Sequence, residues 1–411
     1  MQRLQIFDWT VGPCLNFSSE LKFVLVVKDH CTVTATAPEI TLPAELVPGD
    51  GRFGSGPSKV RVEALAALAA TEDGLLGTSH RRDGVRNVVG RVRDGLGELF
   101  GLPDGYEVVL GNGGATAFWD ASAACLIESR SRHFVFGEFS SKFATVVEDT
   151  PWLEKPDVVE SEFGTHPAAT ADAGIDVYAL CQNETSTGVM MPVLRPAETD
   201  AGALILVDAT SAAGGLEIDP HEFDAYYFSP QKCFGAEGGL WIAALSPAAI
   251  ERTERITGSH NAGRWIPASL NLNTAIENSR KNQSYNTPSL SGMFLLADTI
   301  DWMLGEGGLA FTTRRCRESA GVVYRWAAAH SFATPFVTDA AKRSNTVATI
   351  DFDPAVDATA IAACLRANGI VDTEPYRKLG RNQLRIALFP AIETADVETL
   401  TRAIDYIIER L

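Results

Sequence analysis

The middle of the chain alternates short apolar runs with loops of polar and small residues, and no other feature constrains the fold as strongly. Four such units follow one another from Phe134 onward: FVFGEFSSKFATVV, DVYALCQNETSTGV, ALILVDATSAAGG and DAYYFSPQKCFG. Each unit predicts a buried strand that runs into a loop, which is typical of an α/β domain with a mainly parallel sheet. The segment GGLWIAAL at 238–245 follows too closely for a helical crossover, so we expect it to pair antiparallel with the strand AYYFS.

The chain is long enough for two domains. Its 411 residues exceed what one hydrophobic core usually organises. From about Asp301 the pattern changes to a long helix, two strand-like segments (TVATIDF and QLRIALF) and two further helices, which is typical of a smaller α+β domain. We therefore expect a large α/β domain at 38–300 and a small α+β domain at 301–411. Residues 1–37 match no pattern that continues, and we treat them as an N-terminal extension of unknown role.

Charge and cysteine usage exclude several classes of protein. The chain carries 52 acidic and 35 basic residues, a formal net charge of −17, and its Lys and Arg residues are scattered, which argues against a nucleic-acid partner. The apolar run FVLVV at 23–27 is far too short to span a bilayer, so we expect no membrane segment. The seven cysteines show neither a CxxC pair nor the spacing of a zinc site, which favours a reducing cytoplasm and predicts no metal.

A lysine and an aspartate stand at the ends of two neighbouring predicted strands. Lys232 follows AYYFSPQ, where most lysines are solvated loop residues, and Asp208 ends ALILVD, where the alternative role is to cap a following helix through Thr210 or Ser211. A carboxylate behind four buried aliphatic residues is costly unless it meets a cation. Because ligands sit outside the carboxyl ends of parallel strands, both side chains can serve one site. Together they fit pyridoxal phosphate, whose aldehyde condenses with a lysine and whose protonated ring nitrogen is held by a carboxylate.

The phosphate of such a cofactor needs backbone donors. GNGGATAF at 111–118 places glycines directly before a predicted helix, whose free N–H groups and dipole favour an anion. Gly113, Gly114, Ala115 and Thr116 are the candidates. A tight strand-to-helix connection explains the same glycines equally well.

The cofactor ring also needs an aromatic neighbour and a hydroxyl donor. Phe139, in GEFSSKF, is our choice for the residue that stacks on the ring, and Trp119 is the less favoured option because helical packing is expected to bury it. Thr185, in NETSTG, is placed to donate to the ring hydroxyl oxygen. An ordinary Thr-rich turn is the alternative for that motif.

Taken in chain order, these motifs resemble one family. FGSGPSKV, TSHR, GNGGAT, GEF, NETSTG, VDATS, SPQK, YNTP and LRIALF resemble the phosphoserine aminotransferases, in particular actinobacterial ones, which belong to the class-V, fold-type-I aminotransferases that use pyridoxal phosphate. The resemblance covers about residues 51–411. VDATS with SPQK is specific for the fold type, and SHR with YNTP points to the phosphoserine branch. The resemblance implies a mainly parallel seven-stranded sheet in the large domain.

The resemblance also implies roles for individual residues. Lys232 is the Schiff-base lysine and Asp208 the partner of the ring nitrogen, with Phe139 against the ring and Thr185 as hydroxyl donor. Asn286 and Thr287 of YNTP reach the cofactor phosphate of a neighbouring subunit, which implies a homodimer. The phosphate contacts within the chain are Gly114, Ala115, Thr116 and Gln231. Many family members carry Arg in place of Thr116 and Trp in place of Phe139.

The implied substrates, L-glutamate and 3-phosphohydroxypyruvate, require two anion sites. Arg385, in QLRIALF, is the anchor for the α-carboxylate, because the guanidinium fork binds a carboxylate through two hydrogen bonds; the alternative is an Arg on the exposed face of a strand. His80 and Arg81, with Arg82 close by, precede a predicted helix and are assigned to the second anion. A solvated basic turn is the alternative.

The implied activity is reversible transamination that yields O-phospho-L-serine and 2-oxoglutarate in serine biosynthesis, and the phosphohydroxythreonine step of vitamin B6 synthesis is a related activity. The alternative is another class-V enzyme such as alanine–glyoxylate transaminase. A cysteine desulfurase needs a nucleophilic cysteine on a mobile loop, and Cys316 and Cys364 both fall in helical patterns instead.

Overall fold

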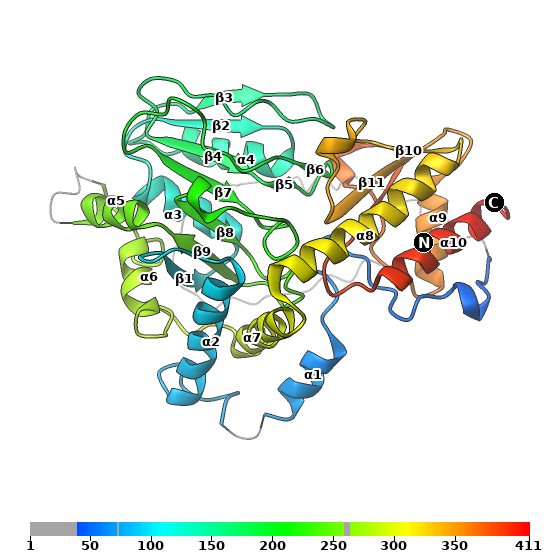
Figure 1. The fold of residues 1–411 in the computed structure, drawn as a ribbon, viewed down its shortest axis with the longest axis horizontal. Coiled ribbons are helices and arrows are strands. Elements are labelled where there is room, and N and C mark those ends of the chain that lie inside the picture. The colour runs from blue at the N-terminus through cyan, green and yellow to red at the C-terminus, as the bar shows by residue number, and fades with distance from the viewer. Residues whose placement is uncertain (1–38, 72–73, 259–263) are drawn as a thin grey trace, which may run out of the picture. The chain divides into compact units, whose positions relative to one another are not determined.

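The computed structural model describes residues 39–71, 74–258 and 264–411 (Figure 1). The expected N-terminal extension at 1–37 lies outside these ranges. The main sheet has seven strands in the order β1-β9-β8-β7-β4-β2-β3. Among them β9 runs antiparallel to both of its neighbours, and the remaining neighbouring pairs are parallel. The predicted mainly parallel, seven-stranded sheet is confirmed, and so is the antiparallel pairing of segment 238–245.

The strands fall into three sheets. The main sheet consists of β1 (Glu107–Asn112), β2 (Ser131–Val135), β3 (Asp157–Glu160), β4 (Val177–Cys181), β7 (Leu204–Asp208), β8 (Ala225–Phe228) and β9 (Leu240–Leu245). A three-stranded sheet contains β10 (Ala333–Pro335), β11 (Val347–Phe352) and β12 (Gln383–Ala387). The short strands β5 (Asn183–Glu184) and β6 (Val189–Met190) pair with each other.

Helices cover both faces of the main sheet, because alternate residues of each buried strand point to opposite sides. In β7, Ile205 and Val207 join the core formed with α2 and α7, whereas Leu204 and Leu206 join the core formed with α3, α5 and α6. The longer helices are α1 (Val62–Ala69), α2 (Asp83–Leu99), α3 (Ala115–Cys125), α4 (Glu138–Glu148), α5 (Pro247–Thr257), α6 (Leu272–Ser279), α7 (Leu290–Gly305), α8 (Gly308–Ala329), α9 (Ala358–Ala367) and α10 (Thr394–Ile408).

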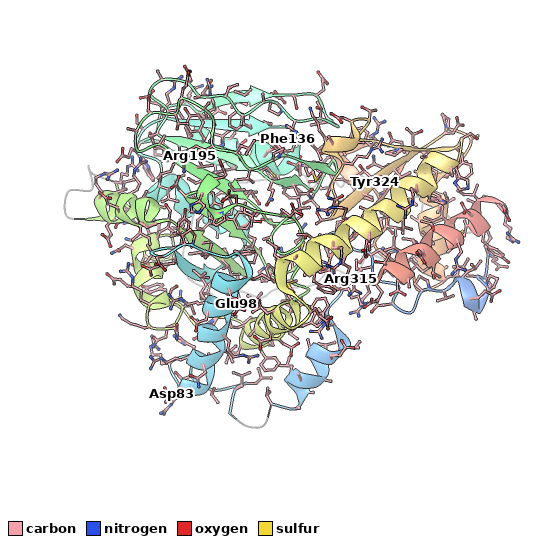
Figure 2. All side chains as sticks on the ribbon, viewed as in Figure 1. Asp83, Glu98, Phe136, Arg195, Arg315 and Tyr324 are labelled. Atoms are coloured by element: carbon pink, nitrogen blue, oxygen red, sulfur yellow. The ribbon has the colours of Figure 1, made fainter. Side chains whose placement is uncertain are left out.

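Polar loops gather at one edge of the main sheet. Strands β2, β4, β7 and β8 are parallel, and β1 runs in the same direction because it and β8 both pair antiparallel with β9. Their carboxyl ends therefore meet at one edge, where open α/β sheets bind ligands. Phe136, directly after β2 and labelled in Figure 2, is completely buried, and only Gly137 separates it from the start of α4.

The three-stranded sheet has a core of its own, which α8, α9 and α10 share. Leu42 and Phe53, from the start of the described chain, belong to the same core. The two predicted strands are confirmed as β11 and β12, and β10 is an addition: its three residues, ending in Pro335, are too short to show an alternating pattern. The domain boundary at 300 stays a prediction, and helix α7 runs across it.

No helix in the described ranges combines the length and the apolar character needed to cross a membrane.

Candidate active site

A cavity of about 250 Å³ opens at the carboxyl edge of the main sheet. Gly56, Trp119 and Asn183 contribute to its wall. The sequence-predicted residues in the wall are Gly114, Ala115, Thr116, Phe139, Thr185, Asp208, Gln231 and Lys232. The structure therefore brings together, from the carboxyl ends of five separate strands, most of the residues that the sequence assigned to one ligand.

Lys232 is buried in this wall, with 8% of its surface exposed, so the solvated-loop alternative does not apply. Its Nζ donates a hydrogen bond to the carbonyl of Ser55 at 2.5 Å and lies 5.8 Å from the centre of the Phe139 ring. Burial, aided by the positive charge of Arg385, lowers the pKa of Lys232 from 10.5 to about 8. Gly56 makes this placement possible, since a Cβ there would lie 2.4–2.7 Å from the end of the lysine side chain.

Asp208 ends β7 with both carboxylate oxygens held. The backbone N–H of Thr210 donates to Oδ1 at 2.9 Å, and the indole N–H of Trp119 donates to Oδ2 at 3.0 Å. Burial raises the pKa of Asp208, and these donors together with Lys232 oppose the rise. The carboxylate is fixed in orientation but is not paired directly with the lysine.

Trp119 is the residue whose role the sequence analysis missed. Its expected burial is observed, at 3% exposed, and the same side chain also reaches the carboxylate of Asp208, 89 positions further along the chain. The sequence did contain one indication of this role. Trp119 lies one helical turn after Thr116, in the first part of the helix that follows the glycine loop.

The glycine loop places a helix N-terminus at the cavity. Gly113 has φ +122°, a region that other residues rarely adopt, and Gly114 is the N-cap of α3. No side chain caps this helix, and the amides of Ala115 and Thr116, at its first two positions, have no acceptor within the helix. The loop thus presents free N–H groups and the positive end of a helix dipole to the cavity.

Phe139 and Thr185 line the cavity from the segments that follow β2 and β4. Phe139 lies in the first turn of α4, where the sequence predicted a loop. Thr185 Oγ1 donates to Ser211 Oγ at 2.8 Å, so its hydroxyl proton is already engaged in this structure. The role of Thr185 as a donor to a ligand stays a prediction that requires this hydroxyl to turn away from Ser211.

Arg385 approaches the same site from β12 of the small sheet. Its Nη1 donates to the carbonyl of Thr185 at 3.4 Å, and its guanidinium lies 5.4 Å from the Tyr376 ring. Burial lowers the pKa of Arg385, and its buried Nε has no partner among the described residues. A cation that is this poorly neutralised favours an anionic ligand.

His80, Arg81, Asn286 and Thr287 do not line this cavity. Thr287 Oγ1 lies 2.9 Å from His80 Nδ1, and the Thr287 carbonyl accepts a hydrogen bond from Asn112 at the end of β1. Arg81, Asn286 and Thr287 are exposed, and His80 is buried with its Nε2 lacking any partner in the described chain. The four residues form a second group, which we call the β1-end cluster.

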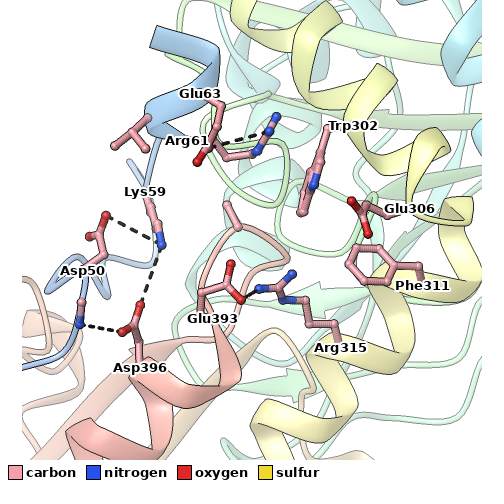
Figure 3. A pocket seen from close by; sticks show the side chains of 13 residues that line it. Asp50, Lys59, Arg61, Glu63, Trp302, Glu306, Phe311, Arg315, Glu393 and Asp396 are labelled. Atoms are coloured by element: carbon pink, nitrogen blue, oxygen red, sulfur yellow. Dashed lines mark hydrogen bonds and ion pairs between the residues drawn. The ribbon is translucent and has the colours of Figure 1, made fainter. Parts of the chain in front are cut away.

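A larger cavity of about 680 Å³ lies elsewhere, between the segment after Gly49, helices α7 and α8, and the start of α10 (Figure 3). It contains none of the predicted site residues. Its cations face carboxylates: Lys59 lies 3.7 Å from Asp50, and Arg315 is paired with Glu393. Because each of its three cations, Lys59, Arg61 and Arg315, is paired with a carboxylate, this cavity offers no unpaired cation for the predicted chemistry.

Comparison with known proteins agrees with the geometry. Residues 166–373 match the family "Aminotransferase class-V". A phosphoserine aminotransferase of Nocardioides sp. is 57% identical over 373 residues, which cover 90% of this chain and 99% of that protein. The chain belongs to the phosphoserine aminotransferase family.

Solved structures share the same fold. A phosphoserine aminotransferase of Cytophaga hutchinsonii, 26% identical, superposes with a TM-score of 0.79 over 87% of this chain and 99% of that chain. A pyridoxal-phosphate-bound phosphoserine aminotransferase of Trichomonas vaginalis, 18% identical, superposes with a TM-score of 0.75 over 87% of this chain and 99% of that chain. The predicted fold type is confirmed.

The cavity suits pyridoxal phosphate, the cofactor of class-V aminotransferases. It offers a buried primary amine, a fixed carboxylate and an uncapped helix N-terminus, which match an aldehyde, a ring nitrogen and a phosphate. Gln231 Oε1 and Asn183 Oδ1, both in cavity-lining residues, are buried without a partner among the described residues. Polar atoms left unsatisfied in this way are expected where a ligand supplies the missing partners.

The first prediction concerns the pH dependence of Lys232 in the cofactor-free aminotransferase. Because the pKa of Lys232 is lowered to about 8, its neutral, nucleophilic form is expected to dominate above that pH. Competitive labelling with acetic anhydride, followed by peptide mapping, should show Lys232 reactivity rising through about pH 8. The same peptide in the unfolded chain should show the rise near the ordinary lysine value of about 10.4. If Lys232 reacted with the same pH dependence in the folded and the unfolded chain, the lowered pKa of Lys232 would be contradicted.

Proposed function

We propose that the chain transfers the amino group of L-glutamate to 3-phosphohydroxypyruvate, giving O-phospho-L-serine and 2-oxoglutarate in serine biosynthesis. The observation that carries this proposal is the cavity lined by Lys232 and Asp208, with the buried cation Arg385 close enough to lower the pKa of Lys232, in a chain that aligns over 90% of its length with a phosphoserine aminotransferase. The overall transfer of the amino group consists of two half-reactions, one for each substrate, so ping-pong kinetics are expected.

Pyridoxal phosphate supplies an aldehyde that condenses with amines and a ring that takes up the electron pair left when a proton leaves Cα. Lys232 holds and moves that proton as general acid and base, and its lowered pKa keeps the amine available as a base near neutral pH. Asp208, held by Thr210 and Trp119, presents a carboxylate for the ring nitrogen. Phe139 covers one side of the cavity and excludes water.

Arg385 binds the α-carboxylate of either substrate in this proposal. Its guanidinium has unsatisfied donors, and it already influences Lys232 electrostatically, so a carboxylate bound there lies near the lysine. Two parallel hydrogen bonds from the guanidinium would fix the amino acid in one orientation. The proton on Cα is thereby presented to Lys232 rather than to solvent.

The β1-end cluster acts on a neighbouring subunit, which makes the functional unit a homodimer. Support comes from its placement: Asn286 and Thr287 are exposed and lie outside the Lys232 cavity, and His80 Nε2 is buried without a partner in the described chain. In a two-fold dimer the same cluster faces the partner's site from each side. His80 and Arg81 would then meet the substrate phosphate, and Asn286 and Thr287 the cofactor phosphate.

Subunit complementation tests this arrangement and is the second prediction. Lys232→Ala and His80→Ala homodimers should both be weakly active. Refolding an equal mixture should restore about a quarter of the wild-type activity, because half the dimers are hybrids and each hybrid has one intact site. A mixture of Lys232→Ala with Arg385→Gln, two residues proposed to serve the same site from one subunit, is the matched control and should restore nothing. If the two mixtures regained the same activity, the proposal that each active site contains residues of both subunits would be contradicted.

The proposed activity is tested by substrate comparison. The purified protein loaded with pyridoxal phosphate should release 2-oxoglutarate from glutamate when 3-phosphohydroxypyruvate is added. The 2-oxo acid corresponding to phosphohydroxythreonine tests the proposed additional role in vitamin B6 synthesis. Alanine with glyoxylate tests the alternative class-V activity, and a preference for that pair would overturn the proposal.

We also propose a cytoplasmic location for the enzyme. Support comes from four buried cysteines in the described part of the chain that form no disulfide, Cys125, Cys181, Cys233 and Cys316, which fits a reducing compartment.

A further inference from the structure

Glu184 is a buried carboxylate that the proposed mechanism does not use. It lies in the NETSTG turn, is fully buried, and has no cation within ion-pair distance among the described residues. Burial raises the pKa of Glu184, and N–H and hydroxyl donors from Ser140 and Ser186 oppose the rise. Such a carboxylate is unusual, because burying a charge is costly unless hydrogen-bond donors or a cation satisfy it.

Its partners are all hydrogen-bond donors, and they come from two segments, the first turn of α4 and the turn that contains Glu184 itself. On one side the backbone N–H of Phe139 lies 3.1 Å from Oε2, and the N–H and hydroxyl of Ser140 lie 2.9 and 3.0 Å from it. On the other side the N–H and hydroxyl of Ser186 lie 3.2 and 2.7 Å from Oε1. The first set consists of the opening amides of α4, so Glu184 caps that helix from 45 positions away.

This cap ties together residues already placed at the cavity. Phe139, whose amide it accepts, carries the ring beside Lys232. Thr185, the next residue in the chain, lines the cavity, and its carbonyl accepts from Arg385. Glu184 and Ser186 also pack directly against Gly137. A Cβ at that position would lie 2.3–2.7 Å from atoms of their side chains.

We propose that Glu184 is a positioning residue: its carboxylate locks the start of α4 to the NETSTG turn and thereby sets the Phe139 ring at the cofactor and the Thr185 peptide at Arg385. The proposal rests on the proposed function, since it concerns the geometry of the same site. It assigns Glu184 no contact with cofactor or substrate.

Glu184→Gln is the direct test, because it keeps the size of the side chain and places an NH₂ group against N–H and hydroxyl donors. Glu138→Gln is the matched control: the same change in the first turn of α4, at a half-buried carboxylate that pairs with two exposed lysines, Lys378 and Lys142. We expect the dissociation constant of pyridoxal phosphate, measured by equilibrium dialysis, to rise at least roughly tenfold in E184Q and to stay near the wild-type value in E138Q. The visible circular dichroism of bound cofactor, which reports ring orientation, should change only in E184Q.

A purely structural role predicts a different result. In that case E184Q lowers the midpoint of urea unfolding of the cofactor-free protein, while the folded fraction binds the cofactor with the wild-type dissociation constant and dichroism. That result would overturn the proposal.

If E184Q does not fold, Ser186→Ala provides the same test more mildly, because it removes one hydroxyl donor to the carboxylate and keeps the charge. An intermediate rise in the dissociation constant with altered dichroism supports the proposal, and wild-type values for both overturn it. A wild-type protein that fails to bind pyridoxal phosphate would overturn the proposed function itself, and with it this inference.

Discussion

Lys232→Ala is expected to lower kcat for transamination by roughly 10²–10⁴-fold, through loss of proton transfer alone. The reason is its place in the site: its Nζ is buried beside the Phe139 ring, and the lowered pKa of about 8 suits it to act as a base. Its loss also removes the amine that holds the cofactor, so borohydride should fix no cofactor to the peptide around position 232. The measurement is the steady-state rate together with peptide mapping after reduction.

Lys155→Ala is the control for this variant. Lys155 is largely exposed, and its ion pair is a long one of 3.5 Å to Glu148, so its removal should leave the rate and the reduced adduct unchanged. If K232A kept activity within about tenfold of wild type, proton transfer would have to be assigned to another group.

Arg385→Gln has the second largest expected effect, a fall of about 10²–10³-fold in kcat/KM for glutamate, since removing one partner of a buried, hydrogen-bonded charge pair costs about 2–5 kcal/mol. Arg385→Lys keeps the charge but loses the planar fork, so it should give an intermediate loss. The value of kcat/KM should fall in both half-reactions, because glutamate and phosphoserine both carry the α-carboxylate that Arg385 binds.

The matched control for Arg385 is Arg381→Gln, a nearby arginine that is exposed and paired with Asp351. Its removal is expected to change kcat/KM little. A selective loss with 3-phosphohydroxypyruvate in R385Q, with glutamate unaffected, would instead place Arg385 at the phosphate.

The sequence predicted those features that local patterns encode. Apolar runs ending in polar loops fixed the parallel strands, and parallel strands place their carboxyl ends together, so Lys232 and Asp208 could be assigned to one site before any distance was known. The glycine loop before α3 was read from the chemistry of a helix N-terminus in the same way.

The remaining features depend on contacts between distant positions. The indole of Trp119 on Asp208, the carboxylate of Glu184 on the start of α4 and the pairing of His80 with Thr287 join residues 89, 45 and 207 positions apart, respectively. No local spacing specifies such pairs, because each depends on how loops fold over the sheet. For the same reason the sequence pattern predicted a loop at Phe139, whereas the structure has the first turn of a helix there, capped by the distant carboxylate of Glu184.

The segment from Phe53 to Ser58 connects the small sheet to the catalytic amine. The N–H of Phe53 donates to the carbonyl of Val371, and the Phe53 carbonyl accepts from the N–H of Ala387 at the end of β12, while the carbonyl of Ser55 accepts from Lys232 Nζ. Ser58 Oγ then donates to the carbonyl of Lys232 at 2.6 Å.

Arg385 lies two residues before Ala387 on the same strand. The same short segment that provides the hydrogen-bond acceptor for Lys232 therefore also pairs with the strand that carries Arg385. A substitution that displaces residues 53–58 is expected to disturb the proton-transferring amine and the carboxylate anchor together, although neither residue belongs to that segment.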